Sequence, residues 1–352
     1  MSEWIIMPSY KLDLACFTNL FFKDPIGIER HREGYERFKD VIDARPDLVS
    51  FAKEGLQQGI MIGVYAASLL SLIEYNGADI DEICSIFDDK KKHLLIQEFL
   101  KKLNSPPEMF ERIKTILPLC SDYLRYLHNN GFYEYWKEEC LPNIENKCRE
   151  FEESAHKYPV VTEVNRLLGF ESVKRKQITL YLCSFNAPYG IGLVNSFISD
   201  IRWKFEDTVA IAIHEMIHPP FSRDKIREIS DYLWQDDFVR EGKERLSIAS
   251  GYHLPEEFIE ENFVEGAHIY LSEVMGVESD PLKYLLDHDN ASHVLSVILY
   301  DALKKGYREK LNTIEEVVEK LIADRSFKTG NIRAKYRQIY LDAGMGKLHP
   351  YQ

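Results

Sequence analysis

The sequence lacks several features that mark whole classes of protein. It has no long run of lysine and arginine, and its formal net charge is −13, so a nucleic-acid-binding face is not expected. Its most apolar stretch, residues 60–73, contains two serines and is shorter than the ~20 residues needed to span a bilayer. Residues 1–22 carry no basic segment, long apolar run or small-residue cleavage site, which excludes a signal peptide. These absences favour a cytoplasmic protein with no membrane span and no nucleic-acid partner.

Cysteine patterns that would indicate a zinc knuckle or a disulfide framework are also absent. The six cysteines form no CxxC pair. A chain of 352 residues, 45% of them hydrophobic, can bury a core large enough to fold without disulfides. We therefore expect reduced, mostly buried thiols in a folded globular protein.

The first part of the chain has a helical pattern. Apolar residues recur at intervals of three and four, and they predict helices over residues 28–43, 47–74, 79–87, 88–103, 107–128 and 131–155. Prolines and Asn-Gly pairs separate these segments. No group of residues here has catalytic spacing, so residues 1–155 are expected to form a helical N-terminal region.

The pattern changes after Pro159. Residues 176–185 are rich in β-branched and aromatic side chains and predict a strand, and residues 191–198 predict a second. The turn residues between them suggest that the two strands form a hairpin at the edge of a small sheet. Helical spacing resumes near Phe205. The expected class is α+β, mostly helical, with a second domain over residues 156–352.

One motif carries recognisable chemistry, the H-E-x-x-H of residues 214–218. On a helix, His214 and His218 lie one turn apart on the same face, so both imidazoles can bind one zinc ion. Glu215 lies beside the first histidine, where it can act as general base toward a zinc-bound water. Because Pro219 and Pro220 follow directly, the helix is expected to end at His218.

A third ligand is expected on a later helix. Residues 255–271 have a strong helical pattern, with Glu261 and Glu265 four apart on one face. One of these carboxylates could bind zinc while the other hydrogen-bonds a ligand histidine and fixes its tautomer. The sequence does not continue as H-E-x-x-H-x-x-G-x-x-H, which excludes a metzincin.

With these residues, the sequence resembles the gluzincins, the thermolysin- and neprilysin-like group of zincin metallopeptidases. Gluzincins carry H-E-x-x-H on one helix and a glutamate on a later helix, often as E-x-x-x-D; the matching residues 261–265 have Glu in place of Asp. The resemblance covers about residues 176–295. It implies a zincin-like catalytic domain that binds one zinc ion per chain, with Glu261 as ligand and Glu265 beside a ligand histidine.

Two assignments within this resemblance have alternatives. Residues 265–270 are also similar to the E-G-x-x-x-Y of zinc aminopeptidases, which would make Glu265 the ligand, although we favour Glu261. In gluzincins a histidine or tyrosine often stabilises the oxyanion. His293 is the preferred candidate because residues 289–293 resemble the thermolysin segment that carries this histidine; the other candidates are Tyr252, Tyr270 and His288.

These residues predict a zinc-dependent peptidase that hydrolyses peptides or proteins through a water activated by Glu215. Two alternatives stay open. A zinc hydrolase of a non-peptide amide or ester would need the same metal site. A non-enzymatic binding protein would hold zinc in a structural or vestigial site, closed by a fourth protein ligand.

Overall fold

The computed structural model describes residues 3–57, 61–102, 107–169, 176–186, 190–193, 196–246, 254–306 and 313–345. Helices dominate, and a four-stranded sheet accompanies them, which confirms the expected α+β, mostly helical class. Among the described helices, none combines the length and apolarity needed to cross a membrane. The chain divides into two compact units: unit 1 holds residues 1–156 and 177–204, and unit 2 holds residues 157–176 and 205–352.

The sheet of unit 1 joins the start of the chain to residues far along it. Its strand order is β1-β2-β4-β3, with bounds β1 (Trp4–Pro8), β2 (Ile178–Cys183), β3 (Ile191–Gly192) and β4 (Ser196–Asp200). β1 runs parallel to β2 with Trp4 opposite Ile178, and β2 runs parallel to β4 with Thr179 opposite Ser196. The short β3 pairs antiparallel with β4.

The expected hairpin between residues 176–185 and 191–198 is therefore wrong. The first strand exists, but its neighbours are β1 and β4, both parallel to it. The antiparallel pair lies inside the second predicted strand instead, where β3 pairs with β4 and the Leu193 amide donates to the Ser196 carbonyl at 2.8 Å. Alternating apolar residues identify a strand but carry no information on a partner that is distant in sequence.

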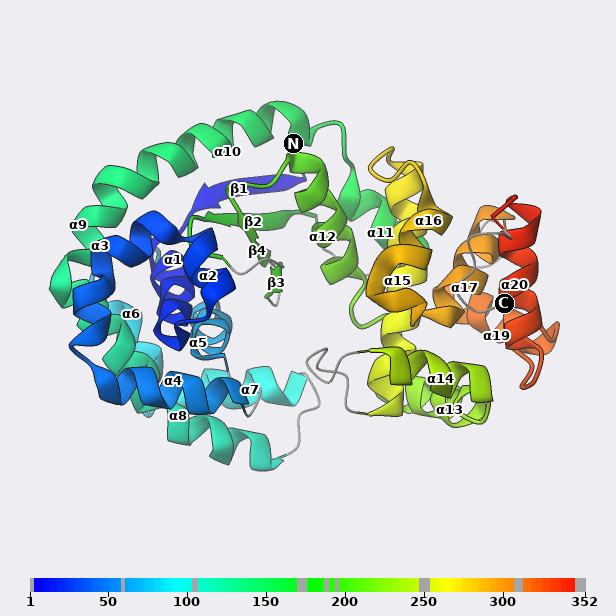
Figure 1. Ribbon diagram of the computed structural model, residues 1–352, viewed down its shortest axis with the longest axis horizontal. Helices are drawn as coiled ribbons and strands as arrows, with labels where there is room; N and C mark the ends of the chain where they lie inside the picture. The colour runs from blue at the N-terminus through cyan, green and yellow to red at the C-terminus, as the bar shows by residue number, and fades with distance from the viewer. Residues whose placement is uncertain are drawn as a thin grey trace. The chain divides into compact units, whose positions relative to one another are not determined.

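The helices of unit 1 are α1 (Tyr10–Phe17), α2 (Pro25–Arg30), α3 (Arg32–Asp43), α4 (Pro46–Gln57), α5 (Ile62–Leu70), α6 (Ile80–Asp88), α7 (His93–Lys102), α8 (Pro107–Leu127), α9 (Tyr133–Tyr135) and α10 (Leu141–Ala155). Most of them lie within the predicted segments, although residues 47–74 hold two helices, α4 and α5, where one was predicted. α1 and α10 pack on the sheet (Figure 1). β1 and α1 were not predicted, because α1 is buried on every side and so lacks a polar face at helical spacing.

Unit 2 is helical throughout its described residues. Its helices are α11 (Val160–Leu168), α12 (Phe205–Ile217), α13 (Arg223–Leu233), α14 (Asp237–Arg245), α15 (Pro255–Val274), α16 (Pro281–Asp287), α17 (Val294–Lys304), α19 (Ile314–Ala323) and α20 (Ile332–Asp342). α15 is the central helix: it packs against α12, α13, α16 and α17 (Figure 1). Asn262 fixes α17 beside it, because its side-chain oxygen accepts from the Leu295 amide at 2.9 Å.

The division of the chain differs from the expected one at residues 177–204. The expected boundary near residue 155 lies next to the end of the first segment of unit 1, at His156. Residues 177–204, however, belong to unit 1 rather than to the domain expected over residues 156–352. The physical reason is the sheet, because β2 has β1 as its neighbour and cannot separate from it without breaking the ladder.

Candidate metal centre

Two helices of unit 2 carry the residues of the H-E-x-x-H motif and the downstream glutamates. α12 ends at Ile217, one residue before the expected end, so His214 lies in its last turn and His218 follows directly. The same helix buries Val209, Ala212 and Ile213 and packs against α15. α15 carries Glu261 and Glu265, both buried. The apolar contact between the two helices thus brings the histidines to the glutamates.

His214, His218 and Glu261 form a triangle of three side chains, in which each histidine nitrogen faces a different oxygen of Glu261. His214 Nε2 lies 3.3 Å from His218 Nε2 and 3.3 Å from Glu261 Oε1. His218 Nε2 lies 3.3 Å from Glu261 Oε2. The two imidazoles and the Glu261 carboxylate therefore converge on one point from three directions.

The other nitrogen of each histidine faces a carboxylate. His214 Nδ1 lies 3.4 Å from Glu265 Oε2, and His218 Nδ1 lies 3.5 Å from Glu260 Oε1. A carboxylate at Nδ1 favours the tautomer with its proton on that nitrogen. In this tautomer the Nε2 lone pairs of both histidines point at the same place as the Glu261 carboxylate, as ligands of one metal ion do. When the imidazoles are protonated instead, their Nε2–H groups can donate to Glu261.

The electrostatics of the cluster call for positive charge at this point. Burial acts to lower the pKa of His214, but Glu261 and Glu265 outweigh it and hold the pKa well above its usual value. Burial also acts to lower the pKa of His218, but the carboxylates of Glu260 and Glu261 outweigh it and raise that pKa to about 9. Burial acts to raise the pKa of Glu261, yet the two histidines hold it well below its usual range. Protons or a metal cation can supply the missing charge.

The geometry fits a zinc ion. A tetrahedral ion with bonds of about 2.0–2.1 Å to nitrogen and oxygen separates its ligand atoms by about 3.3–3.4 Å. The two histidine Nε2 atoms are 3.3 Å apart, and each lies 3.3 Å from one of the two Glu261 oxygens, so the separations are of that size. The donor set of two imidazoles and one carboxylate is also one that zinc accepts in catalytic sites.

Among the described residues, no fourth protein ligand closes the triangle. In the part of the chain that the structure describes, no other His, Cys, Asp or Glu joins the group of His214, His218 and Glu261. The side chains of His214 and His218 remain 22% and 30% exposed. A structural zinc site has four protein ligands, whereas three ligands and an accessible face are typical of a catalytic one.

Glu215, the predicted base, lies between the two histidines on α12 and is half-buried. Successive residues of a helix are rotated by about 100°, which sets Glu215 about 60° around the axis from His218. Among the described residues, no partner holds its carboxylate in a hydrogen bond or ion pair. That leaves the group available to a water or a substrate beside the histidines.

The two candidate oxyanion residues that the structure describes, His293 and Tyr270, do not join the triangle. His293 precedes α17, is 4% exposed, and stacks on Phe258 with ring centroids 6.0 Å apart. Tyr270 is nine residues after Glu261 on α15, which places it about 180° around the helix. Tyr252 and the side chain of His288 lie outside the described residues. The role predicted for His293 stays a prediction.

Glu260 was not predicted as part of the site, and His268 was placed below the other oxyanion candidates. Glu260 faces His218, and His268 Nδ1 lies 3.2 Å from Glu265 Oε2. His268 follows Glu265 by three residues, so helical spacing alone could have placed both on one face of α15. His214, Glu265 and His268 also form a second group whose donor atoms lie within 4.8 Å of one another.

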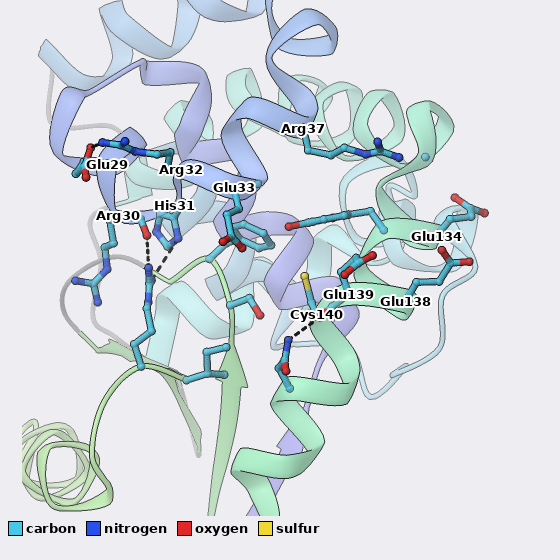
Figure 2. Close-up of a pocket in the computed structure, with 18 residues that line it drawn as sticks. Glu29, Arg30, His31, Arg32, Glu33, Arg37, Glu134, Glu138, Glu139 and Cys140 are labelled. Atoms are coloured by element: carbon cyan, nitrogen blue, oxygen red, sulfur yellow. Dashed lines mark hydrogen bonds and ion pairs between the residues drawn. The ribbon is translucent and has the colours of Figure 1, made fainter.

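Unit 1 contains a separate hollow of about 1030 Å³. Arg30 and His31 line one side of it, and Glu134 and Glu138 line the opposite side (Figure 2). The basic side already has its counter-charge, because the fully buried Asp200 accepts from Arg30 at 2.8 Å. No cluster of potential metal ligands was found here among the described residues.

The chain was compared with known proteins by sequence family, by curated sequence and by solved structure, and none of the three comparisons finds a match.

Proposed function

We propose that the chain is a zinc-dependent peptidase of the gluzincin type, with one zinc ion held by His214, His218 and Glu261. The observation that carries the proposal is the triangle of His214, His218 and Glu261, in which the facing nitrogen and oxygen atoms lie 3.3 Å apart and a further carboxylate stands behind each histidine. Packing alone gives no reason for such a set, since buried ionisable groups are costly unless they are paired.

When bound at such a site, zinc polarises a substrate carbonyl and makes a water more acidic. The residues of the chain do the rest. Glu265 and Glu260 orient the two imidazoles, which keeps the Nε2 lone pairs directed at the ion. Glu215 accepts the proton of the attacking water and returns it to the leaving amine.

Peptides are the proposed substrates because of the resemblance at residues 214–218 and 261–265. The accessible face of the triangle supports catalysis over a structural zinc site, since a structural site would have a fourth protein ligand. A non-peptide amide or ester hydrolase shares the same site, so substrate tests have to distinguish the two activities.

Metal content is the first test. Zinc would be measured by elemental analysis in the wild-type protein and in His214→Ala, with the exposed His156→Ala as matched control. We expect one zinc per chain in the wild type and the control, and none in His214→Ala. A wild-type protein that takes up no zinc at neutral pH would refute the proposal.

Hydrolysis is the second test, and it uses Glu215→Gln. This variant keeps the shape of the side chain and all three ligands but cannot accept a proton, so we expect bound zinc with turnover lowered by about 10²–10⁴-fold. The assay is a quenched fluorescent peptide library, run beside amide and ester substrates. Undiminished peptide hydrolysis in Glu215→Gln would contradict its assignment as the base.

A further inference from the structure

His268 shares the carboxylate that orients His214. Its Nδ1 lies 3.2 Å from Glu265 Oε2, the same oxygen that lies 3.4 Å from His214 Nδ1. The His214 and His268 rings are nearly perpendicular, at 84°, with centroids 5.5 Å apart. One oxygen therefore has an imidazole nitrogen on each of two sides, one from α12 and one from α15.

The environment of His268 is not one that packing alone would select. The residue is 5% exposed, and its Nε2 has no hydrogen-bond partner among the described residues. A neutral imidazole that donates from Nδ1 leaves Nε2 as a buried acceptor. A hydrogen bond left unmade at such an acceptor costs about 1–3 kcal/mol. An apolar side chain would fill this space, beside the edge-on ring of Tyr284, without that cost. The Nδ1 contact to Glu265 is what the histidine adds.

Glu265 needs that contact because it is itself buried, at 2% exposure. A carboxylate held by His214 alone could turn about its terminal bond and present either oxygen. A second N–H on the same oxygen fixes which one faces His214. We propose that His268 is a positioning residue, which locks Glu265 so that His214 presents Nε2 to the metal. This inference rests on the proposed zinc site.

The same three residues could instead hold a second metal ion, since their donor atoms lie within 4.8 Å of one another. His214 would then bind metals through both nitrogens and lose both ring protons. Its Nε2 already belongs to the triangle with His218 and Glu261. We therefore assign Nδ1 of His214 to Glu265 and expect one metal per chain.

The test measures zinc affinity in the full chain by competition with a chromophoric chelator. His268→Asn keeps an N–H close to the Nδ1 position, and His268→Leu has nearly the same shape without a donor. We expect His268→Leu to bind zinc about tenfold more weakly than the wild type, which is the smallest loss typical of removing a residue that hydrogen-bonds the partner of a metal ligand. The affinity of His268→Asn should stay within about threefold of the wild type. The visible bands of the cobalt-substituted protein should shift in the leucine variant only.

The outcomes separate this inference from the proposed function. A wild type that binds no zinc refutes the zinc site itself, before any variant is compared. If His268→Leu binds one zinc as tightly as the wild type does, only the role of His268 is refuted. Two zinc ions per chain in the wild type would also refute that role. Circular dichroism of the metal-free proteins checks folding. If the leucine variant does not fold, His268→Gln replaces it, because its amide reaches the Nε2 position and not Nδ1.

Discussion

At the scale of single residues, histidine is used in two opposite ways. In the candidate metal centre, carboxylates on both sides raise the pKa of His214 and His218. In unit 1, burial lowers the pKa of His31 to about 4, and Arg202 and Arg30 act in the same direction against Asp200. The first environment attracts a cation, whereas the second keeps an imidazole neutral.

The neutral state of His31 predicts acid sensitivity. Its pKa in the folded protein lies below the unfolded value of about 6.5, so only the unfolded chain takes up this proton between pH 6.5 and 4. The free energy of unfolding should therefore fall as the pH is lowered through this window, by about 3 kcal/mol from this group. His31→Gln, whose amide can still donate to the Asn186 carbonyl, should lose that contribution.

The measurement is urea unfolding of wild type and His31→Gln between pH 4 and 7, with the exposed His156→Gln as control. The comparison between variants is needed because burial raises the pKa of Asp13 to about 7. This carboxyl group makes the free energy of unfolding change with pH in the opposite direction. A difference between wild type and His31→Gln that does not change with pH would contradict the prediction.

The residues of the candidate site could be named from the sequence, but their partners could not. The spacing of His214, Glu215 and His218, and of Glu261 and Glu265, is a local property of two helices. Which glutamate faces which nitrogen depends on how α12 rotates against α15, and that is set by buried apolar contacts between residues about 50 apart. His268 was ranked low for the same reason, since nothing local links it to His214.

At the scale of elements, the contact between α15 and α17 keeps the glutamate-bearing helix in place. Gly266 lies at this contact. A Cβ atom there would come within 2.8 Å of the Ser296 carbonyl oxygen and 3.2 Å of Leu299 Cβ. The glycine next to Glu265 is thus explained by close helix packing, which also accounts for the likeness to E-G-x-x-x-Y at this point.

Gly266→Ala should accordingly destabilise the protein. Alanine adds about 1 kcal/mol of helix propensity, but overpacking against the backbone of α17 costs about 1–3 kcal/mol. We expect a net loss of up to about 2 kcal/mol in the free energy of unfolding, measured by urea denaturation. Gly27→Ala in α2 is the control, because its nearest contact would be an ordinary 3.5 Å. A stabilised Gly266→Ala variant would contradict close packing at this site.

The helices and the strands differed in how well the sequence predicted them. Helical spacing located helices that bury one face and keep the other polar, such as α3 and α6. β1 and α1 were missed because neither shows a polar face over enough residues. The order of the sheet depends on pairing across about 170 residues, which no local pattern records.

At the scale of the whole molecule, the chain crosses between the two units at residues 156/157, 176/177 and 204/205. A composition change near residue 155 marked the first crossing, but the return of residues 177–204 to unit 1 depends on the β1–β2 pairing. All ligands of the candidate metal centre belong to unit 2. Zinc binding should therefore stabilise unit 2 directly and unit 1 only if the two units unfold together.

Hydrogen exchange with and without zinc can measure that difference. A ligand that binds only the folded form stabilises it by about 2.7 kcal/mol at a hundred times its Kd. If unit 2 opens without unit 1, amides of α12 and α15 that exchange through opening of unit 2 should slow by about 100-fold, while β1 and β2 should not change. His214→Ala should show no response to zinc in either unit. Equal slowing in both units of the wild type would instead mean that they open together, and that the sheet depends on a metal centre to which it contributes no ligand.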